Sequence, residues 1–233
     1  MSALKSEVLH NSKTILFITS CPEIWGGSEE LWGGAAVELR RRGHRVIAGR
    51  SEPARHWKRH TKWRALHAAG IEAGVFSVPP LFRAVPDAFY RYAPRLAPFF
   101  YGLRNRALSF WIRRLGADLV VIAQGNTFDG MDWVELPLVA RAAGKPYVLV
   151  CQKNAESDWP FDEVRNRNQG HFLHARKAFF VSEHNRLVAE WMMGSKLANA
   201  EVVRNPFMIT TREPLSWPDA SDGVLRLACV GRM

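Results

Sequence analysis

Long hydrophobic runs are missing from this chain of 233 residues. No apolar stretch approaches the roughly 18–20 residues that a membrane-spanning helix needs, and the polar first 13 residues lack the apolar centre of a secretory signal. Cysteine is scarce as well. Cys21, Cys151 and Cys229 are odd in number and far apart, and they form neither a disulfide framework nor a metal-binding pattern of spacing. We therefore expect a protein of the reducing cytoplasm.

Motifs of several enzyme classes are missing too. There is no Gly-x-Gly-x-x-Gly run, no phosphate loop ending in Gly-Lys-Ser/Thr and no Gly-x-Ser-x-Gly elbow, which argues against dehydrogenase, ATPase and α/β-hydrolase chemistry. His171 and His174 are three residues apart but lack the further ligands that a metal site needs. We expect no metal, and both histidines on a solvated helical face.

The net charge of +10 is distributed unevenly along the chain. Residues 40–114 carry 17 basic and 3 acidic side chains, whereas the rest of the chain carries 15 basic and 19 acidic side chains. Between residues 55 and 114 these cations are mixed with aromatic rings. Such a mixture suits an anionic bilayer surface or single-stranded nucleic acid, and we expect peripheral contact with the inner face of a membrane. Alternatively, the rings belong to the core and the arginines are solvated.

Short β-branched runs alternate with longer stretches of helical periodicity. Strands are expected at residues 14–19, 45–49, 71–76, 118–123, 146–151, 178–181 and 201–203, and helices at 28–42, 57–69, 96–115, 131–143, 161–176 and 183–193. Strands that alternate with crossover helices form parallel sheets covered on both faces. The sequence therefore predicts a doubly wound, mostly parallel, Rossmann-like α/β domain over residues 1–205.

The C-terminal residues differ from this pattern. Residues 206–223 are rich in Pro, Asp, Ser and Gly, as linkers are. A further apolar run at 224–230 reads as a strand, but no helix follows it to complete a βα unit. We therefore expect residues 224–233 to be the start of a second domain that is cut short.

A pair of glycines stands between the first expected strand and the first expected helix, in the run Trp25-Gly26-Gly27-Ser28-Glu29. Paired glycines let a backbone approach a ligand closely, and a helix N-terminus offers N–H groups and partial positive charge to phosphates or sugar hydroxyls. Open α/β sheets bind ligands at this edge, outside the carboxyl ends of the strands. The same run also fits a tight turn in which Ser28 caps the helix.

Polar side chains follow later strands toward the same edge. They are Gln124 and Asn126 after the fourth strand, Gln152 and Asn154 after the fifth, Glu183 after the sixth and Asn205 after the seventh. Because amides both donate and accept hydrogen bonds, such a rim suits a ligand rich in hydroxyl groups. Each residue alone is also ordinary turn chemistry, so the interpretation depends on their recurrence at one edge.

The order and spacing of several segments resemble the N-terminal half of a family 4 glycosyltransferase of the GT-B type. These segments are residues 15–19, 26–29, 36–39, 42–46, 117–121, 144–148, 180–183, 202–206 and 227–233. The match spans nearly the whole chain except for the stretch from about Pro53 to Pro98.

This resemblance implies a two-domain enzyme that transfers a sugar from a nucleotide-sugar, with retention of anomeric configuration and without a metal or cofactor. The active site would lie between the domains, and the N-terminal domain would mainly hold the acceptor, a glycan or a lipid-linked molecule. Gly26 and Gly27 would face the donor phosphates and the reacting sugar. Arg232 would pair with the donor diphosphate, a task that suits a guanidinium fork. The candidate binding residues are thus Gly26, Gly27, Ser28, Glu29, Gln124, Asn126, Gln152, Asn154, Glu183, Asn205 and Arg232, and no catalytic residue is assigned.

The sequence departs from the family pattern at two points. Gln152 stands where many relatives have a histidine near the reacting sugar, and glutamine can hydrogen-bond a hydroxyl but cannot take up a proton near neutral pH. The Glu-x7-Glu pair and the phosphate-binding lysine of relatives come after the Gly-Arg with which this chain ends, so we expect these 233 residues alone to be inactive. A non-catalytic basic module that binds nucleic acid or anionic phospholipid is the alternative function.

Overall fold

The computed structural model describes residues 12–21, 23–50, 57–75, 97–128 and 135–206. Its strands are β1 (Thr14–Thr19), β2 (Arg45–Arg50), β3 (Glu72–Val75), β4 (Leu119–Asn126), β5 (Tyr147–Lys153), β6 (Lys177–Phe180) and β7 (Ala200–Val202). Its helices are α2 (Gly27–Arg41), α3 (Thr61–Ala68), α5 (Ala97–Arg114), α6 (Leu136–Ala142), α7 (Asp162–His174), α8 (Glu183–Met193) and the short 3-10 helix η1 (Trp57–Arg59). The strands expected at 14–203 are all present in the expected order.

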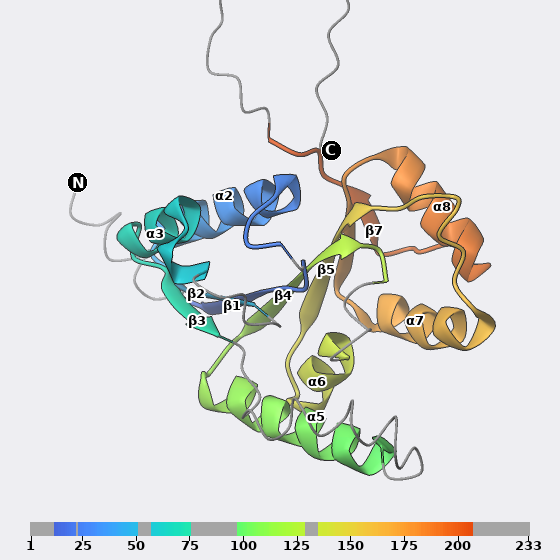
Figure 1. Cartoon of the computed structure of the whole chain (residues 1–233), viewed down its shortest axis with the longest axis horizontal. Helices are drawn as coiled ribbons and strands as arrows, with labels where there is room; N and C mark the ends of the chain where they lie inside the picture. The colour runs from blue at the N-terminus through green and yellow to red at the C-terminus, as the bar shows by residue number, and fades with distance from the viewer. Residues whose placement is uncertain (1–11, 22, 51–56, 76–96, 129–134, 207–233) are drawn as a thin grey trace, which may run out of the picture.

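All seven strands form one parallel sheet, in the order β3-β2-β1-β4-β5-β6-β7 (Figure 1). β1 pairs with β2 on one side and with β4, the central strand of the sheet, on the other. Because the chain winds outward from β1 in one direction and from β4 in the other, the sheet has a topological switch point between these two strands. The prediction of a doubly wound, Rossmann-like α/β fold is confirmed.

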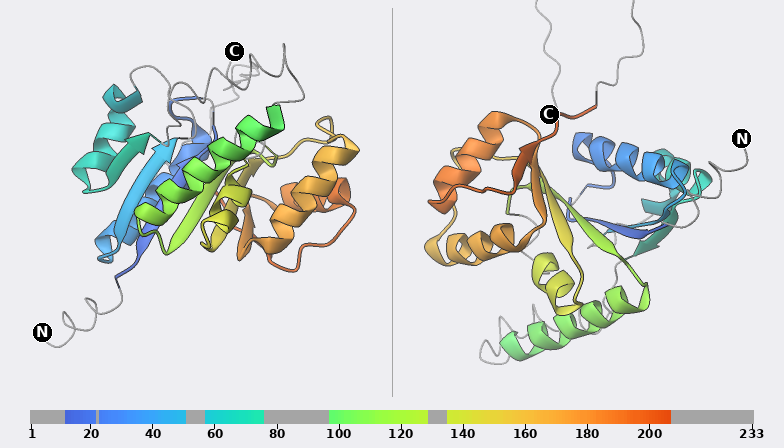
Figure 2. Two further views of the ribbon diagram at one scale, coloured as in Figure 1. Left: turned by 90° about the horizontal axis from the view of Figure 1, so that it is seen from below. Right: turned by 180° about the vertical axis from the view of Figure 1, so that it is seen from behind.

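The sheet separates two hydrophobic cores. Successive side chains of a strand point to opposite faces, and in β1 Ile15 and Phe17 join one core while Leu16 and Ile18 join the other. The first core is covered by α2 and α3, and the second by α5, α6, α7 and α8 (Figure 2). Each short apolar run of the sequence thus supplies both faces, which explains why these strands are continuously hydrophobic.

The ends of α8 show how local sequence sets helix boundaries. Ser182 is the N-cap, and its hydroxyl accepts a hydrogen bond from the backbone N–H of Asn185 at 3.1 Å. At the other end Gly194 adopts a left-handed conformation with φ of 64°, which glycine tolerates better than other residues. The helix predicted at 183–193, with a stop at Gly194, is confirmed.

Two strands are longer than the sequence suggested. We expected β4 to end at residue 123 and β5 at residue 151, but the parallel ladder continues through the pairs Gln124↔Cys151 and Asn126↔Lys153. Those expected ends were wrong because a polar side chain does not interrupt backbone pairing. Consequently Gln124, Asn126 and Gln152 belong to strands and not to the turns after them.

The prediction of a single helix at residues 57–69 is also wrong. His60 has an extended backbone (φ −64°, ψ 136°) and separates η1 from α3. The first turn expected for the helix at 131–143, most of the linker expected at 206–223 and the strand expected at 224–230 lie outside the described residues.

Two adjacent glycines of α2 are expected to respond oppositely to alanine. A Cβ at Gly33 would lie 2.9 Å from the ring of Trp25, which Trp32 and Trp63 hold at centroid distances of 5.5 and 5.9 Å, whereas a Cβ at Gly34 would meet no described atom within 4 Å. We expect Gly34→Ala to raise the free energy of unfolding by about 0.5–1 kcal/mol and Gly33→Ala to lower it by about 1–2 kcal/mol. Urea denaturation of both variants checks this, and equal changes would contradict it.

Candidate functional site

One buried carboxylate fixes the loop between β1 and α2. Glu29 is fully buried. Its Oε1 accepts a hydrogen bond from the hydroxyl of Thr19 (2.9 Å), and its Oε2 accepts from the N–H of Gly26 (2.9 Å) and the hydroxyl of Ser28 (2.8 Å). Because Glu29 reaches back to Gly26, this glycine is the N-cap of α2. The interpretation of Ser28 as the cap was therefore wrong, and the Glu29 carboxylate faces the loop itself.

The two glycines of this loop have different surroundings. A Cβ at Gly26 would lie 3.1 Å from a carboxylate oxygen of Glu23, so the loop is tightly packed there. Gly27 is exposed, and a Cβ at this position would meet no described atom within 4 Å. Open space at the first residue of a helix, beside N–H groups that have no intrahelical acceptor, can admit a phosphate or a hydroxyl group.

Arg50, at the end of β2, supports the same loop from the side. It is only 1% exposed, and its guanidinium donates to the carbonyl oxygens of Cys21 (2.8 Å), Glu23 (2.5 Å) and Ile24 (3.2 Å). A planar guanidinium with several fixed donors holds three carbonyls in one arrangement. Sequence reasoning missed Arg50, and the one available signal was its place at the carboxyl end of a strand next to β1.

Tryptophan rings pack behind this loop. The ring centroids of Trp25 and Trp32 are 5.5 Å apart, those of Trp32 and Trp63 are 5.6 Å apart, and those of Trp57 and Trp63 are 4.5 Å apart. The indole N–H of Trp63 donates to the carbonyl oxygen of Ile24 at 2.9 Å. The loop is therefore anchored to the core that α2 and α3 cover.

The polar residues of β4 have separate environments. Gln124 is 1% exposed and directs its side-chain nitrogen toward the sulfur of Cys151 at 3.6 Å. It therefore lies within the sheet, whereas we had expected it on the rim. Asn126, two residues further along β4, donates to the carboxylate of Asp158 at 3.2 Å. Asn126 therefore does reach the rim.

Buried polar side-chain atoms without hydrogen-bond partners are found at the end of β5. Both polar side-chain atoms of Gln152 and the Oδ1 of Asn154 are buried, and none of the three has a hydrogen-bond partner among the described residues. Asn185 in the first turn of α8 donates through Nδ2 to the carbonyl oxygen of Gln152 (3.2 Å), and Asn154 donates through Nδ2 to the carbonyl oxygen of Asn185 (3.4 Å). A buried polar atom without a partner costs about 1–3 kcal/mol. A polar group that reached these atoms would remove that cost.

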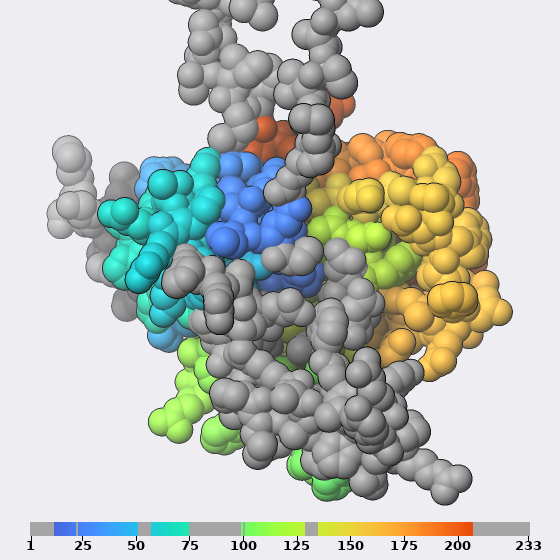
Figure 3. Space-filling model, in the orientation of Figure 1, coloured from blue at the N-terminus to red at the C-terminus, as the bar shows by residue number. Residues whose placement is uncertain are grey.

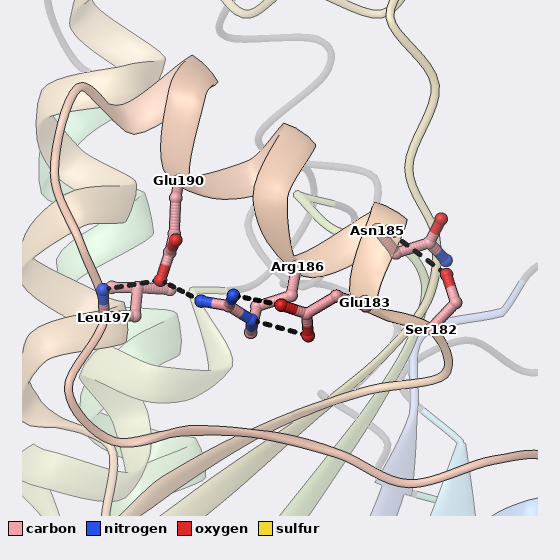
Figure 4. Close-up of polar contacts among 6 residues, drawn as sticks. All are labelled: Ser182, Glu183, Asn185, Arg186, Glu190 and Leu197. Atoms are coloured by element: carbon pink, nitrogen blue, oxygen red, sulfur yellow. Dashed lines mark hydrogen bonds and ion pairs between the residues drawn. The ribbon is translucent and has the colours of Figure 1, made fainter.

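Glu183, at the start of α8, is bound within its own helix. Figure 4 shows the guanidinium of Arg186 between Glu183 and Glu190. The Nε of Arg186 donates to Glu183 at 3.0 Å and its Nη1 donates to Glu190 at 2.8 Å, while the same oxygen of Glu190 accepts the N–H of Leu197 at 3.0 Å. Hydrogen bonding to Arg186 lowers the pKa of Glu183. A ligand that used Glu183 would have to compete with this arginine.

The remaining candidates lie further away or outside the described ranges. Asn205 is exposed and follows β7, so it is at the same carboxyl edge as Gly27, but β4, β5 and β6 stand between their strands. Arg232 lies outside the described residues. Figure 3 shows N-terminal (blue), β4 (light green) and post-β5 (yellow) atoms side by side on one face. The structure thus brings together Gln152, Asn154 and Asn185, with β4 between this group and β1.

His171 on α7 is a buried histidine and not a solvated one. It is 5% exposed, and neither ring nitrogen has a partner within the described ranges, whereas His174 is exposed as expected. The hydroxyl of Tyr147 donates to the backbone carbonyl of His171, which draws this part of α7 against β5. Among the residues that the structure describes, no three His, Cys, Asp or Glu side chains are grouped so that they could hold a metal ion.

The stability of the fold should therefore fall in mild acid. Burial lowers the pKa of His171 from its ordinary value of 6.5. Below that pH the unfolded chain takes up a proton that the folded protein resists, so stability is complete above about pH 6.5 and decreases as the pH falls toward the lower folded-state pKa. His171→Leu should flatten this decrease, and His174→Leu should keep it. Urea denaturation from about pH 7 to 5 measures both, and identical slopes would contradict the assignment.

Comparison with known proteins gives matches in structure only, since no family model and no curated protein sequence matches this chain. Anabaena HepE in complex with UDP is similar with a TM-score of 0.56 and 13% identity, over 83% of this chain and 44% of that one. The HepE complex with UDP-glucose is similar with a TM-score of 0.54 and 16% identity, over 84% of this chain and 44% of that one. A glycosyltransferase from Rickettsia africae is similar with a TM-score of 0.54 and 14% identity, over 83% of this chain and 43% of that one. At these identities the likeness is one of fold, and the chain spans less than half the length of each protein.

Proposed function

We propose that this chain is the acceptor-side domain of a glycosyltransferase that moves a sugar from a nucleotide-sugar donor. The fold supports this, since it is shared with a protein that holds UDP-glucose and with a glycosyltransferase. The observation that carries the proposal is the set of unsatisfied amide atoms on Gln152 and Asn154. They lie at the carboxyl edge of the sheet, with one strand between them and the glycine-opened start of α2.

Each part of this edge has a distinct task in the proposed reaction. The first-turn N–H groups of α2 and the space at Gly27 would receive phosphate oxygens of the donor. The amide of Gln152 would both donate to and accept from a sugar hydroxyl, which positions the sugar without any transfer of a proton. Glu29 and Arg50 would hold the loop in shape and would not touch the ligand, because their polar groups already bind the loop.

The finer parts of the proposal depend on the family resemblance. They are membership of family 4, retention of configuration, independence of a metal, and a glycan or lipid-linked acceptor. In this proposal residues 206–223 link the domain to a second one that begins at residue 224, and Arg232 binds the donor diphosphate. The 233 residues alone should then show negligible turnover.

An NMR titration tests the proposal. The isotopically labelled chain is mixed with UDP-glucose, other nucleotide-sugars and simple glycoside acceptors, and amide signals are followed. We expect shifts at Gly27 and at the side-chain NH₂ groups of Gln152 and Asn154, with none at Gly116, where α5 ends on the other edge of the sheet. The absence of shifts at the carboxyl edge with every compound would overturn the proposal.

A further inference from the structure

The described parts of the basic segment between residues 55 and 114 form helices on opposite faces of the sheet. α3 packs on one core and α5 on the other (Figures 1 and 2). On the α3 side Trp57 and Trp63 are 4% and 1% exposed, so the rings there belong to the core and the cations beside them are solvated. On α5, in contrast, Phe99 and Phe110 are each 63% exposed. Burial in the core therefore explains the rings beside α3 but not Phe99 and Phe110.

The outward face of α5 combines apolar and cationic side chains. Phe99, Leu103, Arg106, Phe110 and Arg113 are spaced by four and three residues, which places them in one line along a helix. The opposite side of the helix is buried through Arg104, Leu108, Ser109 and Ile112. The two phenylalanines thus lie largely outside the core that this side of the helix covers.

The charge on α5 has one sign only. The helix Ala97–Arg114 contains four arginines and no aspartate or glutamate. Arg106 and Arg114 are exposed on the helix that carries the two rings, and Arg113, also exposed, donates to the backbone carbonyl oxygen of Ala142. Figure 1 shows α5 at the outer end of the molecule, away from α2, α3 and α8.

We infer that the outward face of α5 binds an anionic phospholipid bilayer and lies in its surface. Rings in line can enter the boundary between headgroups and acyl chains, while guanidinium groups beside them bind lipid phosphates. None of the helices in the described ranges is both long and apolar enough to cross a membrane. This contact is separate from the carboxyl edge of the sheet and does not depend on sugar transfer.

Vesicle co-sedimentation of the 233-residue chain tests the inference. Vesicles of equal parts phosphatidylglycerol and phosphatidylcholine are compared with vesicles of phosphatidylcholine alone. We expect binding at least about tenfold tighter to the anionic vesicles. Phe99→Ser/Phe110→Ser and, separately, Arg106→Gln/Arg114→Gln should each weaken that binding about tenfold.

A matched control removes exposed apolar side chains elsewhere. Leu173→Ser/Trp191→Ser changes α7 and α8, where these residues are 55% and 61% exposed, and should leave vesicle binding unchanged. Thermal melts of all variants should remain close to that of the parent chain, because every altered residue is exposed or partly exposed.

Four outcomes would overturn the inference. They are equal or negligible binding to both kinds of vesicle, equal loss of binding in the control variant, tighter binding to a single-stranded oligonucleotide that the α5 variants abolish, and a dimer in sedimentation velocity that the phenylalanine variant dissociates. The last two would assign the α5 face to nucleic acid and to a second copy of the chain.

Discussion

Replacing Glu29 by alanine is expected to lower the free energy of unfolding by about 3 kcal/mol. The substitution removes a fully buried carboxylate that accepts hydrogen bonds from Thr19, Gly26 and Ser28. Those three donors would be left without an acceptor, and a cavity would form behind the β1–α2 loop. Urea denaturation measures the loss. Amide hydrogen exchange should also show faster exchange at Gly26 and Gly27.

Two further variants separate the causes of this loss. Glu29→Gln keeps the volume of the side chain but directs an NH₂ group at a donor, so most of the destabilisation should remain. Glu38 lies on the same helix but is partly exposed, with its carboxylate bound to Arg41 and Arg42 on the surface, and Glu38→Ala should change stability little. A Glu29→Ala protein as stable as the parent would contradict the role given to this carboxylate.

Replacing Gln152 by leucine should weaken ligand binding strongly while changing the stability of the free protein little. Leucine removes two buried polar atoms that lack partners, so the free protein should be as stable as the parent or more stable by about 1 kcal/mol. If a ligand satisfies those atoms, the loss of its hydrogen bonds should weaken binding by about ten- to a hundredfold. The ligand to use is the nucleotide-sugar or acceptor that gives the largest NMR shifts.

The control for this variant makes the same chemical change elsewhere. Gln169 lies on α7 and not on a strand end, and Gln169→Leu should leave affinity unchanged. A Gln152→Leu protein that binds normally but unfolds more easily would mean that this amide is structural.

The fold was largely predictable because its signals are local. Burial on both faces gives continuous apolar strands, helical periodicity separates them, and glycine at the end of a helix such as α8 stops it at Gly194. Alternation of these elements implies a parallel sheet. The failures occurred where a pairing partner extends a strand, as the ladder between β4 and β5 does for Gln124 and Asn126, since pairing with a distant segment leaves no local sign.

The edge of the sheet that carries the candidate residues was predictable, but the contacts of their side chains were not. Reasoning about strand ends identified the edge of the sheet, and the structure confirms that Gly27, Gln152 and Asn205 lie at that edge. Reasoning from the sequence did not show that Glu29 binds its own loop or that Glu183 is bound to Arg186. Side-chain roles depend on atoms that meet only after folding.

The sequence by itself determined the type and order of the strands and helices, because hydrophobic periodicity and helix caps act over a few residues. Only the tertiary structure decided which polar groups remain unsatisfied and which basic helix turns its rings outward. No sequence pattern shows whether Arg50, Asn185 or the phenylalanines of α5 are buried, bonded or exposed, because their environments follow from packing between segments that are far apart in the chain.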